Sequence, residues 1–103
     1  MNKGSSVLIN GRASVGEGEI QIIGGDRKQF CATLSDAVAG DSATVEVLFT
    51  PDATKAKGTV IATLSVTYGQ PVDFTAPIDM VFQNFYARVT AISGGSVHCF
   101  GAY

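Results

Sequence analysis

The stretch that decides the fold is residues 86–101, which read YARVTAI (86–92), SGGS (93–96) and VHCFG (97–101). Both outer runs are rich in β-branched, aromatic and other strand-forming residues, and the glycine-containing tetrapeptide separates them. Two such runs around a short glycine turn are typical of a β-hairpin. The sequence therefore predicts that the two runs pair with each other and complete a core that the earlier strands begin.

Two stretches before it alternate between apolar and polar residues. Residues 43–50 read ATVEVLFT, and residues 59–67 read TVIATLSVT. A period of two marks a strand with one buried face. In the first stretch Leu48 falls on the polar side with Thr44, Glu46 and Thr50, so we expect it to be exposed. The residues that we expect in the core are Val45, Val47, Phe49, Leu64 and Val89.

Shorter β-like runs and turn signals fill the rest of the chain. Further strands are expected at 6–10, 13–23, 29–34 and 72–75. In the third of these, Phe30, Ala32 and Leu34 share one face and Cys31 and Thr33 the other. Asn10-Gly11 and Gly24-Gly25-Asp26 predict turns. Residues 35–42 predict a loop with a short turn of helix, and 51–58 an exposed loop. Residues 78–84 predict a connection that tucks Met80, Val81 and Phe82 beneath the sheets.

Length and composition indicate one folded domain. The chain has 103 residues, of which 46% are hydrophobic and 16% are charged. No stretch of eleven or more residues has helical periodicity, and several short strands follow one another at near-regular spacing. We therefore predict an all-β fold, an antiparallel β-sandwich or jelly roll, over residues 1–103, with residues 1–6 as a flexible N-terminal arm. Sparse charge also favours a surface that is buried against a partner.

Charge and hydropathy exclude two classes of partner. A net charge of −2 argues against a nucleic-acid binder, which needs a basic surface. No apolar run approaches the roughly 20 residues that span a bilayer, so we expect no membrane partner. The sequence MNKGSS at residues 1–6 lacks the apolar stretch of a signal peptide, and we therefore expect the protein to fold first in a cytoplasm.

No pattern in the chain predicts catalysis, a metal site or a cofactor. Cys31 and Cys99 read as two buried free thiols rather than as a disulfide, and with a single histidine they cannot supply four zinc ligands. His98 reads as an ordinary strand residue rather than as a catalytic base. Glu17 and Glu19 read as solvated side chains. We therefore predict a non-enzymatic protein.

Two kinds of side chain suggest binding instead. Tyr68, Tyr86 and Tyr103 could form a platform for sugars, although tyrosines at the rim of a core are the more ordinary interpretation. The chain has no Trp, the residue that such sites use most. Arg88 stands alone on an otherwise uncharged strand, where an arginine lies at a subunit contact or forms a local salt bridge.

Four segments together resemble small β proteins of tailed bacteriophages. They are SATVEV (42–47), IATLSV (61–66), FTAP (74–77) and, most specifically, YARVTAISG (86–94). Members of this group are virion structural components, including capsid decoration (cement) proteins and small tail or neck parts. The loop at 51–58 departs from the group, because relatives often carry a Trp there. The resemblance implies a structural role and no catalytic residue.

Three functions follow from these observations. The first is a decoration protein on the capsid surface of the virion, which binds the major capsid protein or other virion proteins and forms a homo-oligomer, a dimer or a trimer. Its expected contacts are Phe85, Tyr86, Arg88 and the arm with Ser5 and Ser6. The second is a tail, neck or baseplate component, or a module that binds a glycan receptor. The third is a bacterial β-sandwich interaction domain without a virion.

Overall fold

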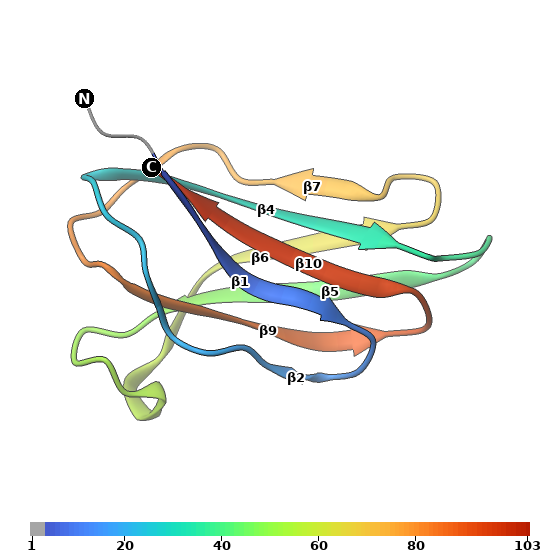
Figure 1. Cartoon of the computed structure of the whole chain (residues 1–103), viewed down its shortest axis with the longest axis horizontal. Coiled ribbons are helices and arrows are strands. Elements are labelled where there is room, and N and C mark those ends of the chain that lie inside the picture. Colours follow the sequence, from blue (N-terminus) through green and yellow to red (C-terminus); the bar gives the residue numbers. More distant parts are fainter. Residues whose placement is uncertain (1–3) are drawn as a thin grey trace.

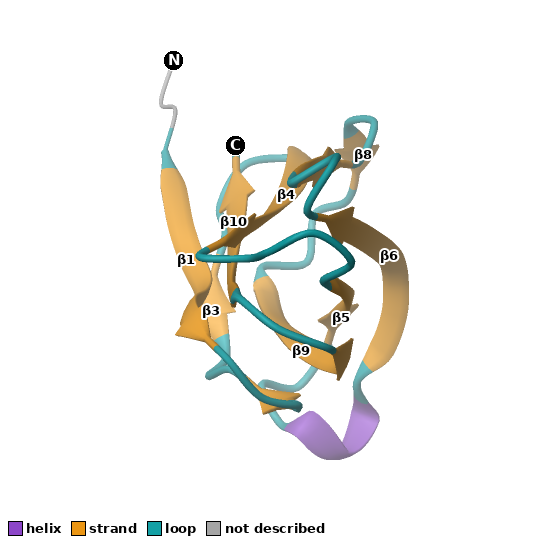
Figure 2. Ribbon diagram, turned by 90° about the vertical axis from the view of Figure 1, so that its right-hand side faces the viewer, coloured by secondary structure: helices purple, strands orange, loops and turns teal. Residues whose placement is uncertain are grey.

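Two antiparallel β-sheets pack face to face in the computed structural model, which describes residues 4–103 (Figure 2). This architecture confirms the all-β sandwich expected from the alternation of residues 43–50 and 59–67. Lys55–Lys57 forms one 3₁₀ turn (η1). The strands are β1 (Ser5–Arg12), β2 (Gly16–Glu17), β3 (Gln21–Ile22), β4 (Arg27–Ser35), β5 (Ser42–Phe49), β6 (Thr59–Thr67), β7 (Val72–Phe74), β8 (Ile78–Asp79), β9 (Asn84–Ile92) and β10 (Ser96–Ala102).

The order of the strands is that of a jelly roll (Figure 1). Sheet A has the order β1-β10-β4-β7, with β8 beside the start of β4, and sheet B has the order β2-β9-β5-β6, with β3 beside β9. The chain thus pairs as one long hairpin, β1 with β10, β2 with β9, β4 with β7 and β5 with β6. Rolling this hairpin up puts alternate pairs into the two packed sheets: β1 with β10 and β4 with β7 in sheet A, and β2 with β9 and β5 with β6 in sheet B.

The predicted hairpin at residues 86–101 is wrong. Its two runs are strands, β9 and β10, but they lie in different sheets and do not pair. The connection crosses between the layers because it is anchored to the start of β5, where the Ser93 N–H donates to the Ser42 carbonyl at 2.9 Å. Gly95 has φ +82°, and a Cβ there would come within 2.8 Å of the Ser35 carbonyl oxygen. The glycines therefore allow a tight crossing between sheets.

The core lies between the sheets and contains the residues that alternation predicted. Val45, Val47, Leu64 and Val89 are buried, and Phe49 is half-buried against them. Phe30 of sheet A and Phe85 of sheet B meet in the centre, with ring centroids 5.3 Å apart at 51°. These tilted rings link the two layers.

The N-terminal part differs from the expectation in two ways. Asn10-Gly11 is a β-bulge inside β1, with Gly11 at φ +71°, so the strand continues to Arg12 instead of turning. Ser5 and Ser6 pair with β10 at Ala102 and Gly101, and the Ser6 hydroxyl donates to the Ile22 carbonyl. The expected flexible arm is therefore wrong from Ser5 onward, and its residues 1–3 lie outside the described part of the chain.

Two other segments are less regular than predicted. The expected strand at 13–23 contains only the two short strands β2 and β3, separated at Gly18 and its neighbours. At the end of this segment Ile22 is exposed and Ile23 is buried in the core. Residues 36–41 form a turn-rich loop without a helix.

Candidate functional site

Arg88 belongs to a charged row on the outer face of sheet B. The strand register aligns Glu17, Arg88 and Glu46 side by side across β2, β9 and β5. The Arg88 Nε donates to the Glu46 carboxylate at 2.7 Å. This hydrogen bond raises the pKa of Arg88. Of the two roles expected for Arg88, the structure shows the local salt bridge.

Residues 51–58 fold across the same face and cover two apolar side chains. Leu48 and Tyr86 are register partners on the outer side of β5 and β9, and both are buried. The Tyr86 hydroxyl donates to the Lys55 carbonyl at 3.4 Å, and the Lys55 ammonium lies 5.5 Å from the centroid of the Tyr86 ring. Leu48 is therefore not exposed as predicted; it lies beside Tyr86, which the loop covers, and the two form a small second core.

Asp52 holds this loop in shape. Its carboxylate accepts hydrogen bonds from the Thr54 hydroxyl at 2.9 Å and from the Thr50 hydroxyl, and it lies 3.2 Å from the Lys57 ammonium. Thr50, which was predicted to be on the polar side, is buried, and its single hydroxyl proton is shared between the Asp52 carboxylate and the Thr54 carbonyl. The hydrogen bond from Thr54 is the largest cause of a pKa of about 2 for Asp52.

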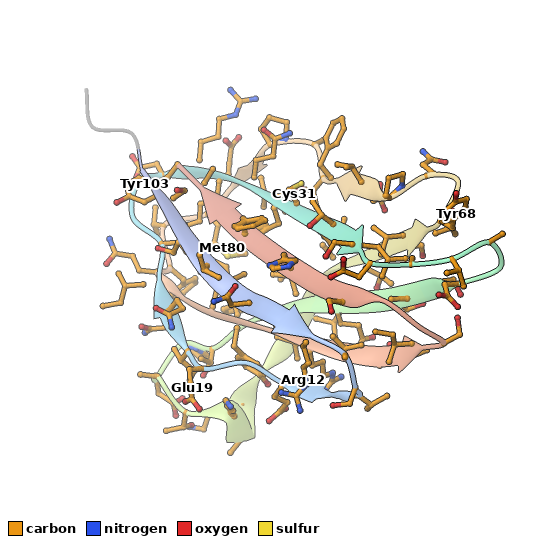
Figure 3. All side chains as sticks on the ribbon, turned by 45° about the vertical axis from the view of Figure 1, so that its right-hand side comes forward. Arg12, Glu19, Cys31, Tyr68, Met80 and Tyr103 are labelled. Atoms are coloured by element: carbon orange, nitrogen blue, oxygen red, sulfur yellow. The ribbon has the colours of Figure 1, made fainter. Side chains whose placement is uncertain are left out.

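The expected contact residues do not form one surface. Phe85 is in the core and Tyr86 is under the loop, so neither offers a side chain to a partner. Ser5 and Ser6 lie on β1 of the opposite sheet from Arg88. The three tyrosines do not converge either, because Tyr68 and Tyr103 lie at opposite ends of the sandwich (Figure 3).

An apolar row crosses the outer face of sheet A. The register places Val7, Phe100, Cys31 and Phe74 side by side on β1, β10, β4 and β7. Val7 is 47% exposed and Phe74 is 64% exposed. Figure 3 shows Cys31 on β4, in the middle of this face. We call these four residues the apolar row.

The surroundings of the apolar row carry almost no charge. The next row along the same strands consists of Asn10, His98, Thr33 and Val72. The His98 ring is parallel to that of Phe100, with centroids 6.4 Å apart. In the described part of the chain, no Asp, Glu, Lys or Arg points outward from sheet A between Arg12 at one end and Arg27 at the other. We call this surface the apolar face.

The two cysteines are free thiols on opposite sides of sheet A. Cys99 pairs with Ala32 and points into the core, whereas Cys31 pairs with Phe100 and points outward. Burial raises the pKa of the Cys99 thiol to about 12. Burial and the nearby Asp73 carboxylate raise the pKa of Cys31 as well. Both thiols are free, as expected, but only Cys99 is buried; the expected burial of Cys31 is wrong, because its side chain points outward from sheet A and is half-buried.

A second apolar surface is a groove at the end of the sandwich where β4 begins and β5 ends. It encloses about 590 Å³. Phe49 and Phe82 stack in it with ring centroids 5.5 Å apart, and Val81 is 69% exposed. We call it the end groove, and its lining residues are Asp26, Arg27, Phe49, Asp79, Met80, Val81 and Phe82.

The end groove corrects the expectation that residues 80–82 tuck beneath the sheets. Only Met80 packs against the core, whereas Val81 and Phe82 point to solvent. Backbone hydrogen bonds hold the segment in this position, from Met80 N–H to the Asp26 carbonyl and from Ile23 N–H to the Gln83 carbonyl, both at 2.8 Å. The exposed side chains are therefore carried on a fixed backbone.

Lys28, which was not among the residues predicted from the sequence, supports this segment from inside. The side chain is buried, and its ammonium donates to the carbonyls of Gly25 and of Met80, the latter at 2.7 Å. Burial lowers the pKa of Lys28. The alternation along β4 could have predicted this burial, because Lys28 lies two residues before Phe30 and so falls on the same inward face as Phe30, Ala32 and Leu34.

Among residues 4–103, no three His, Cys, Asp or Glu side chains gather as a metal site would need. The same residues include no helix with the length and apolar character needed to span a membrane.

Comparison with known proteins supports the fold. The crystal structure of SPBc2 prophage-derived protein YomS is similar, with a TM-score of 0.50, 16% sequence identity and coverage of 98% of this chain and 91% of that chain. At this identity the likeness shows a shared fold over nearly the whole chain. The sequence matches no protein-family model and no curated protein.

Proposed function

We propose that this protein is a structural component of a bacteriophage virion, and that it binds the assembled capsid and stabilises it as a decoration protein. The end groove is the observation that carries the proposal. Its centre is apolar and aromatic, with Phe49, Val81 and Phe82, and its rim is charged, with Arg27 and Asp79. An apolar centre within a polar rim is the anatomy of protein–protein contact sites.

The phage origin rests on two likenesses. The four segments quoted above resemble small phage β proteins, and the fold resembles that of a protein described as prophage-derived. A structural role also agrees with where the chain uses its polar groups. Arg88 and Glu46 bond to each other, and Lys28 bonds to backbone carbonyls, so these charges serve the fold.

Stabilisation follows from mass action. A protein that binds the assembled lattice but not its separated subunits shifts the equilibrium toward the lattice. The end groove is small, so a single contact is weak. Many copies on a symmetric shell, each bridging neighbouring capsid subunits, would together resist its opening.

Co-sedimentation with capsids that lack the protein tests this proposal. The test variant is Val81→Asp in the end groove, and the control is Val38→Asp in the loop at the opposite end. The two valines are 69% and 68% exposed, so both changes have a similar effect on folding. We expect the wild type and the control to sediment with capsids and to raise their resistance to heat, and the Val81→Asp variant to remain in solution.

Two results would overturn the proposal. Failure of the wild-type protein to bind capsids would remove the decoration role. Antibody labelling at the tail tip would move the protein to the tail or to receptor recognition. Equal binding by both variants would keep the role but exclude the end groove as the contact.

A further inference from the structure

The apolar face of sheet A is an interaction surface of its own, distinct from the end groove. Its centre is the apolar row of Val7, Phe100, Cys31 and Phe74, and no loop of the described chain covers it as residues 51–58 cover part of sheet B. We propose that this face packs against the same face of a second copy, about a twofold axis that runs along the strands.

The order of residue sizes in the apolar row favours a second copy as the partner. A twofold axis along the strands, between β10 and β4, reverses the strand order in the facing sheet. Phe74 of one copy then faces Val7 of the other, and Phe100 faces Cys31. Each phenylalanine meets a smaller side chain, which is how facing layers interdigitate in a sandwich core. An axis across the strands would instead set Phe100 against Phe100.

The lack of charge fits the same partner. Two like faces can pack only if neither buries an unpaired ion, because an uncompensated buried charge is strongly destabilising. The apolar face meets this condition in both copies, because no Asp, Glu, Lys or Arg of the described chain points outward from it between its Arg12 end and its Arg27 end. The charged residues remain at the two ends of the strands, in the solvated rim of the contact.

The size of the face indicates a weak dimer. Three strands of seven to nine residues and the three-residue β7 cover about 430 Å² at ordinary strand rise and spacing. Two copies together would bury about 900 Å², which is in the range of weak, transient interfaces. We therefore expect a dimer that forms in the micromolar range or above and dissociates on dilution.

The axis also decides where the end grooves point. A rotation about an axis along the strands does not change positions along that axis. The two end grooves therefore lie at the same end of the dimer. The two grooves could then bind one surface together, and this consequence rests on the proposed function. The pairing of the apolar faces does not, because it stands even if capsid binding fails.

Sedimentation velocity over a range of concentrations tests the pairing. The test variant is Val7→Asp on the apolar face, and the control is Val60→Asp on the outer face of sheet B, where Val60 is 40% exposed. We expect a dimer for the wild type and the control, and self-association at least about tenfold weaker for Val7→Asp. A wild type that stays monomeric up to its solubility limit would overturn the proposal, as would a dimer that tolerates Val7→Asp. Circular dichroism would confirm that both variants fold.

A mixing experiment tests the axis. If Val7 faces Phe74 of the partner, a Val7→Asp chain and a Phe74→Lys chain place opposite charges together, and we expect the mixture to dimerise more strongly than either variant alone. If Val7 faces Val7, mixing brings no such pairing, and that result would exclude the proposed axis.

Cys31 gives a readout without any substitution. It lies under Phe100 of the partner in the proposed dimer, whereas Cys99 is inside the core in either state. We expect a maleimide to label Cys31 more slowly as the protein concentration rises, and Cys99 only on unfolding. A labelling rate at Cys31 that does not change over the range in which dimers form would place the contact elsewhere.

Discussion

The two sheets carry rows of four aligned residues on their outer faces, and the rows differ in what their side chains contact. On sheet B the row is Glu17, Arg88, Glu46 and Thr63. In this row Arg88 bonds to Glu46, and Glu17 lies 3.7 Å from the Lys55 ammonium of the covering loop. On sheet A it is Val7, Phe100, Cys31 and Phe74, which lie beside one another without a charged member.

The outer face of sheet B thus serves the fold, whereas we propose that the outer face of sheet A receives a partner. Sheet B uses its outer residues within the chain, through the Arg88–Glu46 pair and through the loop that buries Leu48 and Tyr86. Sheet A leaves exposed apolar side chains that residues 4–103 do not cover, and such surfaces mark interaction sites. Substitutions on sheet B should therefore alter stability, and those on sheet A should alter association.

The largest effect on stability is expected from a substitution that unfolds the protein and so destroys both sheet faces. Val47→Asp puts a carboxylate into the core shared by the sheets, which costs several kcal/mol and should abolish folding. The matched change Val60→Asp on the same hairpin is exposed and should leave a cooperative melt. Normal melting of the Val47→Asp variant would contradict the position of the core.

Leu48→Ala should have the next largest effect. It empties the small core beneath residues 51–58, and we expect a loss of about 2–3 kcal/mol in the free energy of unfolding. Val7→Ala on the apolar face should change it by less than about 0.5 kcal/mol. Urea denaturation of both variants, at a concentration where the protein is monomeric, makes the comparison. Equal losses would mean that the two faces do not differ in their contribution to stability.

A smaller effect on the free energy of unfolding is expected from the ion pair of Arg88 and Glu46. A double-mutant cycle with Arg88→Ala and Glu46→Ala should give a coupling energy well below the loss at Leu48, because both side chains are partly exposed and screened. The coupling should shrink further at high salt. A coupling of zero at low salt would show that the pair contributes nothing to the fold.

The smallest effect is a pH dependence of the stability that Asp52 contributes through the loop at residues 51–58. The pKa of Asp52 is about 2 in the folded chain, against an ordinary value of 3.8. Its stabilising contribution is therefore complete above pH 4 and is lost as the pH falls toward 2. Melting curves from pH 7 to pH 2 should show this loss in the wild type and less of it in Asp52→Asn. If NMR showed that the Asp52 carboxyl titrates near pH 3.8, that result would contradict the hydrogen bonds that it accepts from Thr54 and Thr50.

Local patterns predicted the strands well, because burial of one face imposes a period of two on the sequence. Val45, Val47 and Leu64 were placed correctly in the core for this reason. The pairing partners were not predictable in the same way. A glycine turn such as residues 93–96 suits a hairpin as well as a crossing between layers, and the choice depends on β5 and β4, which lie far away in the sequence.

The candidate surfaces were harder to predict than the fold. Phe85 and Tyr86 look like contact residues in a sequence, since nothing local shows that a loop thirty residues earlier covers Tyr86. Val81 and Phe82 look like core residues, since nothing local shows that Lys28 and Asp26 hold their backbone at the rim. The apolar row joins four distant strands and becomes visible only when their registers are known.

Electron cryo-microscopy of phage particles that contain this chain would test the central claim most directly. We predict density on the capsid exterior, with the sheet A faces of two copies packed together, both end grooves against the capsid and the charged face of sheet B toward solvent. Absence of the chain from the particle would contradict the proposed function. Attachment through sheet B, with the apolar faces open to solvent, would contradict the different roles of the two faces.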